Sequence, residues 1–257
     1  MRVKPAMEVD QTLYKSLMVL ETVARSSEPC GVTELADRLG LTKSNTHRIL
    51  RGLVVLGYLR PAEARGRYEL TSKLWELGSH FFSRLDIRRI CAPYMAQIAE
   101  ATQETILLSV LEGTEVLFLD MIESPQTVRA YTGVGERAPA QYVASGRIQL
   151  AWADEATVAL AKERLYSNTP CSITDPAALA AELDQIRRQG FAICEGEWVE
   201  NANSIAVPVR DASGRIVAGI GVAGPASRLD RKTCIRHSPF LLGISREISG
   251  LLGYTDP

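Results

Sequence analysis

Hydrogen-bond donors gather in one short stretch of the chain, GVTELADRLGLTKSNTHRILRGLVVL, residues 31–56. Side chains of lysine, arginine, histidine, asparagine, serine and threonine donate to phosphate oxygens and to the edges of base pairs. The sequence therefore predicts a DNA contact surface that includes Thr33, Thr42, Lys43, Ser44, Asn45, His47, Arg48 and Arg51. The alternative is an ordinary solvated helical hairpin, because charged residues are common on any helix surface.

Two short helices joined by a tight turn would present these side chains. Leu35, Ala36 and Leu39 share one apolar face of the first helix, and Gly40 ends that helix in a left-handed conformation. Thr42 is the expected N-cap of the second helix. The buried stripe of the second helix should consist of Thr46, Ile49, Leu50 and Leu53. The donors then face outward near its N-terminal end, the part of a helix-turn-helix that enters the major groove.

The flanking segments complete the pattern of a winged helix. Residues 13–24 suit an amphipathic third helix, and short strands after Gly57 and over residues 68–70 enclose the polar loop PAEARGR. Arg65 and Arg67 are predicted to contact phosphates or the minor groove. Residues 1–75 hold 12 Lys and Arg against 8 Asp and Glu, whereas the remaining chain holds 17 against 22. The excess of basic residues in residues 1–75, beside an acidic remainder, favours DNA as the partner of the N-terminal part.

Length and composition exclude several classes of protein. The 257 residues are comfortable for two compact units, and 46% hydrophobic with 23% charged residues is ordinary for a globular protein. No apolar stretch is long enough to cross a bilayer and no secretory signal is visible, so we expect a cytoplasmic protein without a membrane partner. The 5 cysteines and 3 histidines are scattered, which predicts reduced thiols and no metal site.

A connecting helix is expected between the two units. The segment TSKLWELGSHFFSRLD places apolar residues at helical spacing, namely Leu74, Leu77, Phe81, Phe82 and Leu85. Such a helix packs either on its copy in a dimer, which would align two recognition helices on the duplex, or on the second domain. The pattern leaves both open, and Gly78 is a hypothetical bend. The expected parts are a winged helix-turn-helix over residues 8–70, a linker helix over 71–88 and a second domain over 89–257.

The second domain mixes strand and helix patterns. Strands are expected over residues 104–110, 115–122, 127–131, 191–194, 204–209 and 216–222. Helices are expected over residues 91–102, 145–153, 156–165, 176–189 and 232–252. Because the last two strands flank the turn DASGR as a hairpin, the order of elements favours an antiparallel sheet with helices on its faces. This is the α+β arrangement of a sensor domain.

No motif in the chain has the structural context that catalysis would require. Residues 219–224 match G-x-G-x-x-G, but they lie inside a hairpin strand and Pro225 follows, so a dinucleotide site is excluded. Ser145 is expected to be a helix N-cap rather than a nucleophile, and helix N-termini suit carboxylates. We therefore expect neither catalytic residues nor a cofactor. Two further classes stay open: an enzyme fused to a DNA-binding head, and an architectural DNA binder that takes no ligand.

Several phrases of this chain resemble the IclR family of bacterial transcriptional regulators over about residues 10–253. They are TKSNTHRIL followed by GYL, RYELTSKLWELG, ASGRIQLAWA, and GFAICEGEW with NSIAVPVRDASGRIVAGIGVAGPASRLD. The resemblance implies an α+β chain with an N-terminal winged helix-turn-helix for operator DNA, a linker helix, and a C-terminal GAF-like domain for a small organic effector. It also implies a homodimer or a dimer of dimers acting as a repressor or activator, often of catabolic genes.

The resemblance also assigns a pocket, residue by residue. The positions that it implies for the effector are Ala144, Ser145, Gly146, Cys194, Glu195, Ser204, Gly221 and Ala223. Tyr142 and Trp198 are available as aromatic walls. Since Gly221 and Ala223 stand where family members often carry hydroxyls, the pocket should be wider and less polar, which favours a bulky aromatic effector over a two-carbon acid. Arg147 either forms an ion pair with the protein body, the favoured interpretation, or reaches an anionic ligand.

Overall fold

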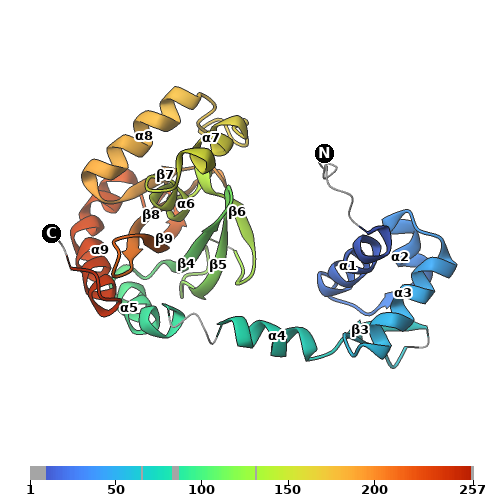
Figure 1. The fold of residues 1–257 in the computed structure, drawn as a ribbon. Coiled ribbons are helices and arrows are strands. Elements are labelled where there is room, and N and C mark those ends of the chain that lie inside the picture. The colour runs from blue at the N-terminus through green and yellow to red at the C-terminus, as the bar shows by residue number, and fades with distance from the viewer. Residues whose placement is uncertain (1–9, 65, 83–86, 131, 256–257) are drawn as a thin grey trace. The chain divides into compact units, whose positions relative to one another are not determined.

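The chain forms two compact units, shown as ribbons in Figure 1. In this computed structural model the described residues are 10–64, 66–82, 87–130 and 132–255. The first unit spans Met1–Leu85 and the second spans Asp86–Pro257. Among the described residues, no helix combines the length and apolar character that crossing a membrane requires.

The first unit is a winged helix-turn-helix, as the sequence predicts. Its helices are α1 (Gln11–Ala24), α2 (Val32–Leu39) and α3 (Lys43–Val55). A small antiparallel sheet of order β1-β3-β2 completes it, with β1 (Cys30–Gly31), β2 (Leu59–Pro61) and β3 (Arg67–Leu70). The core between helices and sheet is Val19, Leu20, Val23, Cys30, Leu35, Ile49, Leu50, Leu53 and Leu59.

The turn between α2 and α3 forms for local reasons. Gly40 has φ +64°, the left-handed conformation that lets α2 end without a Cβ penalty. Thr42 then accepts a hydrogen bond from the backbone N–H of Asn45 at 3.3 Å and caps α3. The four predicted core positions of α3, Thr46, Ile49, Leu50 and Leu53, are all buried. The remaining face of α3 is consequently turned to solvent.

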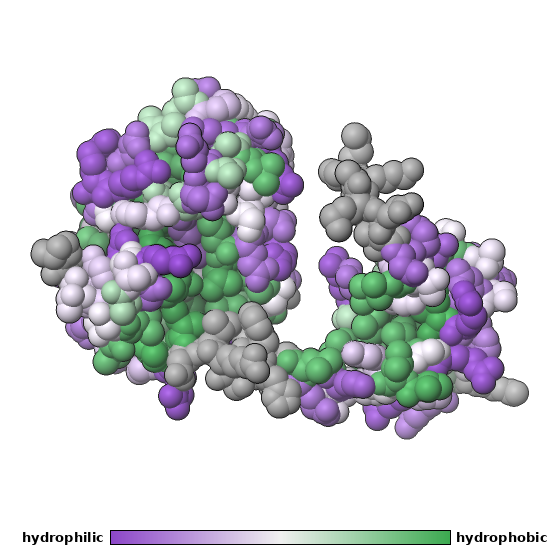
Figure 2. All heavy atoms as spheres, in the orientation of Figure 1, coloured by the Kyte–Doolittle hydropathy of each residue, from purple (hydrophilic) through white to green (hydrophobic). Residues whose placement is uncertain are grey.

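The linker segment forms helix α4 (Lys73–Phe82), which is continuous through Gly78. The hypothesis of a bend at Gly78 remains a prediction, and Leu85 lies outside the described residues. Trp75 is 76% exposed and Leu77 is 49% exposed on this helix. Hydrophobic atoms, drawn green in Figure 2, are visible on the surface of the first unit. Helix α5 (Ile87–Thr102) starts earlier than the sequence predicts, because Ile87 and Cys91 are both buried in the second unit.

The second unit is built on one antiparallel sheet of strand order β6-β5-β4-β9-β8-β7. The strands are β4 (Thr105–Glu112), β5 (Glu115–Ile122), β6 (Arg137–Pro139), β7 (Ala192–Glu195), β8 (Ala202–Arg210) and β9 (Ile216–Pro225). Its other helices are η1 (Ala140–Tyr142), α6 (Ala144–Leu150), α7 (Glu155–Glu163), α8 (Pro176–Gln189) and α9 (Arg231–Leu251). Helices α5 and α9 pack together, and α6 lies on the sheet with α8 beside it (Figure 1).

Two local predictions in this unit are wrong. Residues 127–130, the described part of an expected strand, are irregular, because the free edge of β5 is taken by β6 instead. The aliphatic side chains of Val128 and Ala130 line a cavity rather than extend the sheet. Ser145 is not an N-cap: α6 begins at Ala144, so Ser145 lies in its first turn. The cap residue is Val143, whose side chain has no polar atom to form a capping bond.

Close backbone contacts explain several glycines of the second unit. A Cβ at Gly219 would lie 2.7 Å from the carbonyl oxygen of Ser145, since α6 rests directly on β9 there. A Cβ at Gly221 would lie 2.8 Å from the carbonyl oxygen of Ile205 on the neighbouring strand. Gly219 and Gly221 therefore allow close packing of β9 against α6 and against β8.

Candidate functional site

The outer face of α3 carries the predicted DNA-contacting side chains. Most of them are exposed, namely Lys43, Ser44, His47, Arg48 and Arg51. Asn45 is half-buried, and its side-chain oxygen accepts a hydrogen bond from the Arg48 guanidinium at 3.2 Å. Thr42 is committed to the cap of α3 but remains exposed, as does Thr33 on α2. The first two turns of α3 thus present hydrogen-bond donors on a surface free of apolar side chains.

The arginines of the wing are engaged by acidic and carbonyl groups of the first unit. Arg60 Nε lies 2.8 Å from Glu69 Oε1 across the β2–β3 pair. Arg67 lies 3.5 Å from Glu34 Oε2, and it also donates to the carbonyl oxygen of Pro29. Arg65, the third arginine of the predicted wing, lies outside the described residues. To contact phosphates, Arg60 and Arg67 must exchange these partners, so α3 has the more available donors.

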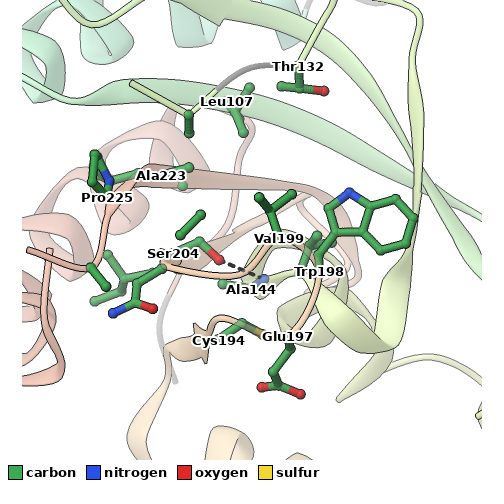
Figure 3. Close-up of a pocket in the computed structure, with 18 of the residues that line it drawn as sticks. Leu107, Thr132, Ala144, Cys194, Glu197, Trp198, Val199, Ser204, Ala223 and Pro225 are labelled. Carbon is green, nitrogen blue, oxygen red and sulfur yellow. Dashed lines mark hydrogen bonds between the residues drawn. The ribbon is translucent and has the colours of Figure 1, made fainter. Parts of the chain in front are cut away.

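A cavity of about 660 Å³ opens in the second unit between the sheet and the first turn of α6. Figure 3 shows side chains from the sheet, from α6 and from the segment after β7 facing this space. Of the ten residues assigned from the sequence, eight line it: Tyr142, Ala144, Ser145, Cys194, Trp198, Ser204, Gly221 and Ala223. The structure thus brings together residues that are up to 81 positions apart in the chain.

Gly146 and Glu195 do not line the cavity. A Cβ at Gly146 would lie 2.3 Å from the carbonyl oxygen of Ala140, so this glycine allows α6 to meet the preceding turn. Glu195 Oε2 forms an ion pair with Arg231 at 2.7 Å on the exposed side of β7. Alternation of side chains along a strand explains the second case, because Cys194 faces the cavity and its neighbour must face away.

A buried ion pair, Arg147–Glu197, forms beside the cavity wall. The guanidinium contacts Glu197 Oε2, and its Nε donates to the carbonyl oxygen of Gln141 at 2.7 Å. Glu197 Oε2 also accepts from the backbone N–H of Ile173 at 3.3 Å. Burial raises the pKa of the Glu197 carboxyl, and the neighbouring guanidinium opposes this effect. Arg147 therefore forms the ion pair with the protein body that the sequence favoured.

Glu197 is the residue that sequence reasoning missed. Glu197 is among the residues that line the cavity, and its carboxylate is turned away from the cavity centre in Figure 3. The available signal was Arg147 itself: an arginine in a helix as apolar as ASGRIQLAWA needs an acidic partner when it is buried. The segment CEGEW offered two candidates, and only the three-dimensional structure selects the second.

The backbone at Trp198 is held by hydrogen bonds from side chains of a neighbouring loop. Asn168 Nδ2 donates to the Trp198 carbonyl oxygen at 2.6 Å, and Ser172 Oγ donates to that of Glu197 at 2.8 Å. The Trp198 side chain is 37% exposed at the cavity wall. The opposite aromatic wall, Tyr142, is buried and is held by its hydroxyl, which accepts from the backbone N–H of Tyr166 at 2.6 Å. The Tyr142 ring is therefore held through its hydroxyl, whereas at Trp198 the hydrogen bonds hold the backbone that carries the ring.

The cavity lining is mostly apolar, although Arg129, Thr132 and Asn203 are among its residues. Ser204 Oγ accepts a hydrogen bond from the Ala144 backbone N–H at 3.3 Å, as drawn in Figure 3. The Ser145 hydroxyl has no hydrogen-bond partner among the described residues, although Ser145 is only 5% exposed. Burial raises the pKa of the Cys194 thiol, which keeps it neutral and a poor nucleophile. This lining suits reversible binding of a largely apolar molecule with a small number of hydrogen-bonding groups.

A winged helix-turn-helix joined to a unit with a ligand-sized cavity defines a DNA-binding transcriptional regulator. The family model for the IclR helix-turn-helix domain matches residues 12–63. The model for the C-terminal domain of the bacterial transcriptional regulator IclR matches residues 79–250. The chain belongs to the IclR family, which confirms the resemblance and the predicted fold class.

Individual relatives agree with this assignment. The chain is 32% identical to the HTH-type transcriptional regulator KdgR of Escherichia coli (strain K12), over 95% of this chain and 94% of KdgR. The crystal structure of Thermotoga maritima IclR shares 28% identity with a TM-score of 0.79, over 95% of this chain and 99% of that one. An IclR homolog from Microbacterium hydrocarbonoxydans, complexed with 4-hydroxybenzoate, shares 27% identity with a TM-score of 0.80, over 93% of this chain and all of that one.

Proposed function

We propose that this regulator controls catabolic genes in response to a small aromatic compound or organic acid that binds in the cavity of the second unit. It acts in the cytoplasm on operator DNA, as a repressor or activator, and as a homodimer or a dimer of dimers. The observation that carries the proposal is the cavity of about 660 Å³ at the residues that the sequence assigned to an effector. Small-molecule sites are typically roughly 300–1,000 Å³ and mostly apolar.

An aromatic effector fits the lining better than a two-carbon acid. Gly221 and Ala223 offer no hydroxyl, while Tyr142 and Trp198 offer aromatic faces. The structurally similar Microbacterium hydrocarbonoxydans protein was crystallised with an aromatic acid, 4-hydroxybenzoate, which supports this class of ligand. An architectural DNA binder without a ligand would fill the same space with its own side chains, so the open volume counts against that alternative.

Binding in the cavity can change operator affinity only if the effector prefers one arrangement of the DNA-binding units. The proposed test is fluorescence anisotropy on the DNA upstream of the protein's own gene, at fixed salt and with random DNA as competitor. Benzoate, 4-hydroxybenzoate, phenylacetate, pyruvate and glyoxylate would be added one at a time. Specific binding that one aromatic compound alters supports the proposal. A response to glyoxylate or pyruvate alone would contradict the aromatic preference.

Filling the cavity should weaken effector binding and leave operator binding unchanged. Ala223→Leu adds a branched side chain to the cavity wall, and we expect aromatic binding about tenfold weaker, equivalent to roughly 1.4 kcal/mol. The change in intrinsic tryptophan fluorescence, to which Trp198 at the cavity wall contributes, is the readout of effector binding, and anisotropy is the readout of operator binding. Ala181→Leu, on the exposed face of α8, is the matched control and should bind the effector like the unsubstituted protein. Equal effector affinity in both variants would place the effector elsewhere.

Charges at the exposed apolar residues of α4 should disrupt the proposed dimer. Trp75 and Leu77 are large apolar side chains that the first unit leaves exposed. The double substitution Trp75→Asp with Leu77→Asp is expected to lower the mass in sedimentation equilibrium and to weaken operator binding at least tenfold. Val134→Asp, at an exposed apolar residue of the second unit, is the control. An unchanged mass would show that α4 does not hold the copies together.

A further inference from the structure

Asn45 and Arg48 of α3 form a hydrogen-bonded pair on the DNA-facing side of the first unit. The guanidinium Nη2 donates to Asn45 Oδ1 at 3.2 Å, between residues three positions apart on one face of the helix. Arg48 is exposed and Asn45 is half-buried, so the arginine head group stands outermost. The N-cap at Thr42 fixes where α3 begins, and therefore how far along the helix this pair lies.

We propose that this pair reads a guanine in the major groove of the operator, with Arg48 as the base-contacting residue and Asn45 as its positioning residue. The proposal rests on the DNA-binding class of the protein and is independent of the effector. Guanine presents two adjacent acceptors, N7 and O6, to the major groove. The guanidinium carries five N–H donors and no acceptor, so it can give two bonds to guanine and another to Asn45.

The hydrogen bond within the pair also disfavours a bidentate contact between Asn45 and adenine. Arginine has no acceptor, so the amide atom that faces it must be the oxygen. Adenine recognition by asparagine needs both amide groups, since the oxygen accepts from N6–H and the nitrogen donates to N7. One lone pair of Oδ1 is engaged by Arg48, so the guanidinium sets the orientation of the Asn45 amide and this orientation is not free to align both amide groups with adenine. The pair as a whole therefore presents donors and matches an acceptor-rich base edge.

The two described arginines of the wing are less suited to base reading than Arg48. Arg60 is held by Glu69 at 2.8 Å, and Arg67 lies 3.5 Å from Glu34, so their charges are turned to carboxylates within the wing. The partner of Arg48 is a neutral amide, which orients the guanidinium without neutralising it. Orientation before binding reduces the rotamer entropy that Arg48 loses on the DNA, which favours a defined contact over a mobile phosphate contact.

The test is sequence selection from a random duplex library with the full-length protein and its variants. The unsubstituted protein is expected to enrich sequences with an invariant guanine. Arg48→Ala should lose the preference for guanine at that position by roughly 10- to 100-fold, the worth of a bidentate base contact, and keep the other preferences. Asn45→Ala should reduce the preference at the same position by a smaller factor. Asn45→Asp should also reduce it, because a carboxylate would pair with the Arg48 guanidinium and neutralise it, as Glu69 does with Arg60.

Arg38→Ala is the matched control, because Arg38 is an exposed arginine of α2 that pairs with Glu34 at 3.6 Å and lies outside α3. It should select the same sequences as the unsubstituted protein, and circular dichroism would verify that every variant is folded. The proposal is overturned if Arg48→Ala enriches the same guanine as the unsubstituted protein. It is equally overturned if Asn45→Ala specifically loses an adenine, since Asn45 would then read a base itself.

Discussion

Gly146→Ala is expected to destabilise the second unit by about 3 kcal/mol, the upper part of the range for overpacked sites. The added Cβ would lie 2.3 Å from the carbonyl oxygen and 2.4 Å from the Cα of Ala140. These are backbone atoms, so no rotamer change can relieve the clash, and η1 must move away from α6. Because both elements contribute to the cavity wall, effector binding should weaken as well. Urea unfolding followed by circular dichroism measures the free-energy change.

Gly243→Ala is the control for Gly146→Ala. A Cβ at Gly243 in α9 meets nothing within 4 Å, and replacing glycine in a helix by alanine typically stabilises it by about 0.5–1 kcal/mol. The contrast also separates two roles for Gly146. If Gly146→Ala alters effector affinity and leaves the unfolding midpoint unchanged, then Gly146 contacts the ligand as the sequence proposed, and the packing role is wrong.

Arg147→Met should destabilise the second unit by about 3–5 kcal/mol, the usual result of removing one partner of a buried ion pair. The side chains of Arg147 and Glu197 are 2% and 8% exposed. Without the guanidinium, Glu197 is a buried carboxylate with one remaining hydrogen bond, from Ile173, and the Gln141 carbonyl oxygen loses a donor at 2.7 Å. The loop that carries Trp198 follows Glu197 directly, so the variant should also bind effector poorly. The free energy of unfolding in urea is again the measurement.

Replacing both Arg147 and Glu197 should restore much of the stability that Arg147→Met loses. Arg147→Met combined with Glu197→Leu removes the uncompensated charge, and such apolar replacements are often neutral. A double variant no more stable than Arg147→Met alone would show that charge is not the cause.

The stability that Arg147→Met loses should also depend on pH in a defined direction. Burial raises the pKa of Glu197 above its ordinary value of 4.5, and loss of Arg147 removes the group that opposes this. A carboxyl whose pKa is raised by folding binds its proton more readily in the folded state, so folding gains stability as the pH falls. The deficit of the variant should therefore shrink between about pH 8 and about pH 5. A constant deficit over that range would argue against a buried carboxylate.

The DNA-binding unit was predictable because its determinants are local. Gly40 ends α2, Thr42 caps α3, and the stripe of Thr46, Ile49, Leu50 and Leu53 decides which face is buried. Each of these features acts within one or two helical turns, so it is visible in sequence spacing. The wing was predicted as a pair of strands for the same reason. The partners of Arg60 and Arg67 come from other elements, and their engagement was not visible.

The second unit was predictable in its elements and less so in its details. The turn at residues 211–215 and the Asp175-Pro176 start of α8 carry local signals and are confirmed. The segment at residues 127–130 has the aliphatic composition of a strand, but the edge of β5 is paired with β6. Composition alone does not distinguish an apolar residue that extends a sheet from one that lines a cavity.

The sequence by itself determined the class of this protein: a helix-turn-helix with a donor-rich recognition helix, an α+β second unit, and eight of the residues that line the cavity. Only the tertiary structure decided that Gly146 packs on Ala140, that Glu195 faces solvent and that Glu197 neutralises Arg147. The physical reason is the distance along the chain over which each interaction acts. Capping and periodicity act between near neighbours, whereas a buried ion pair across 50 residues or a close backbone contact exists only once strands and helices are packed.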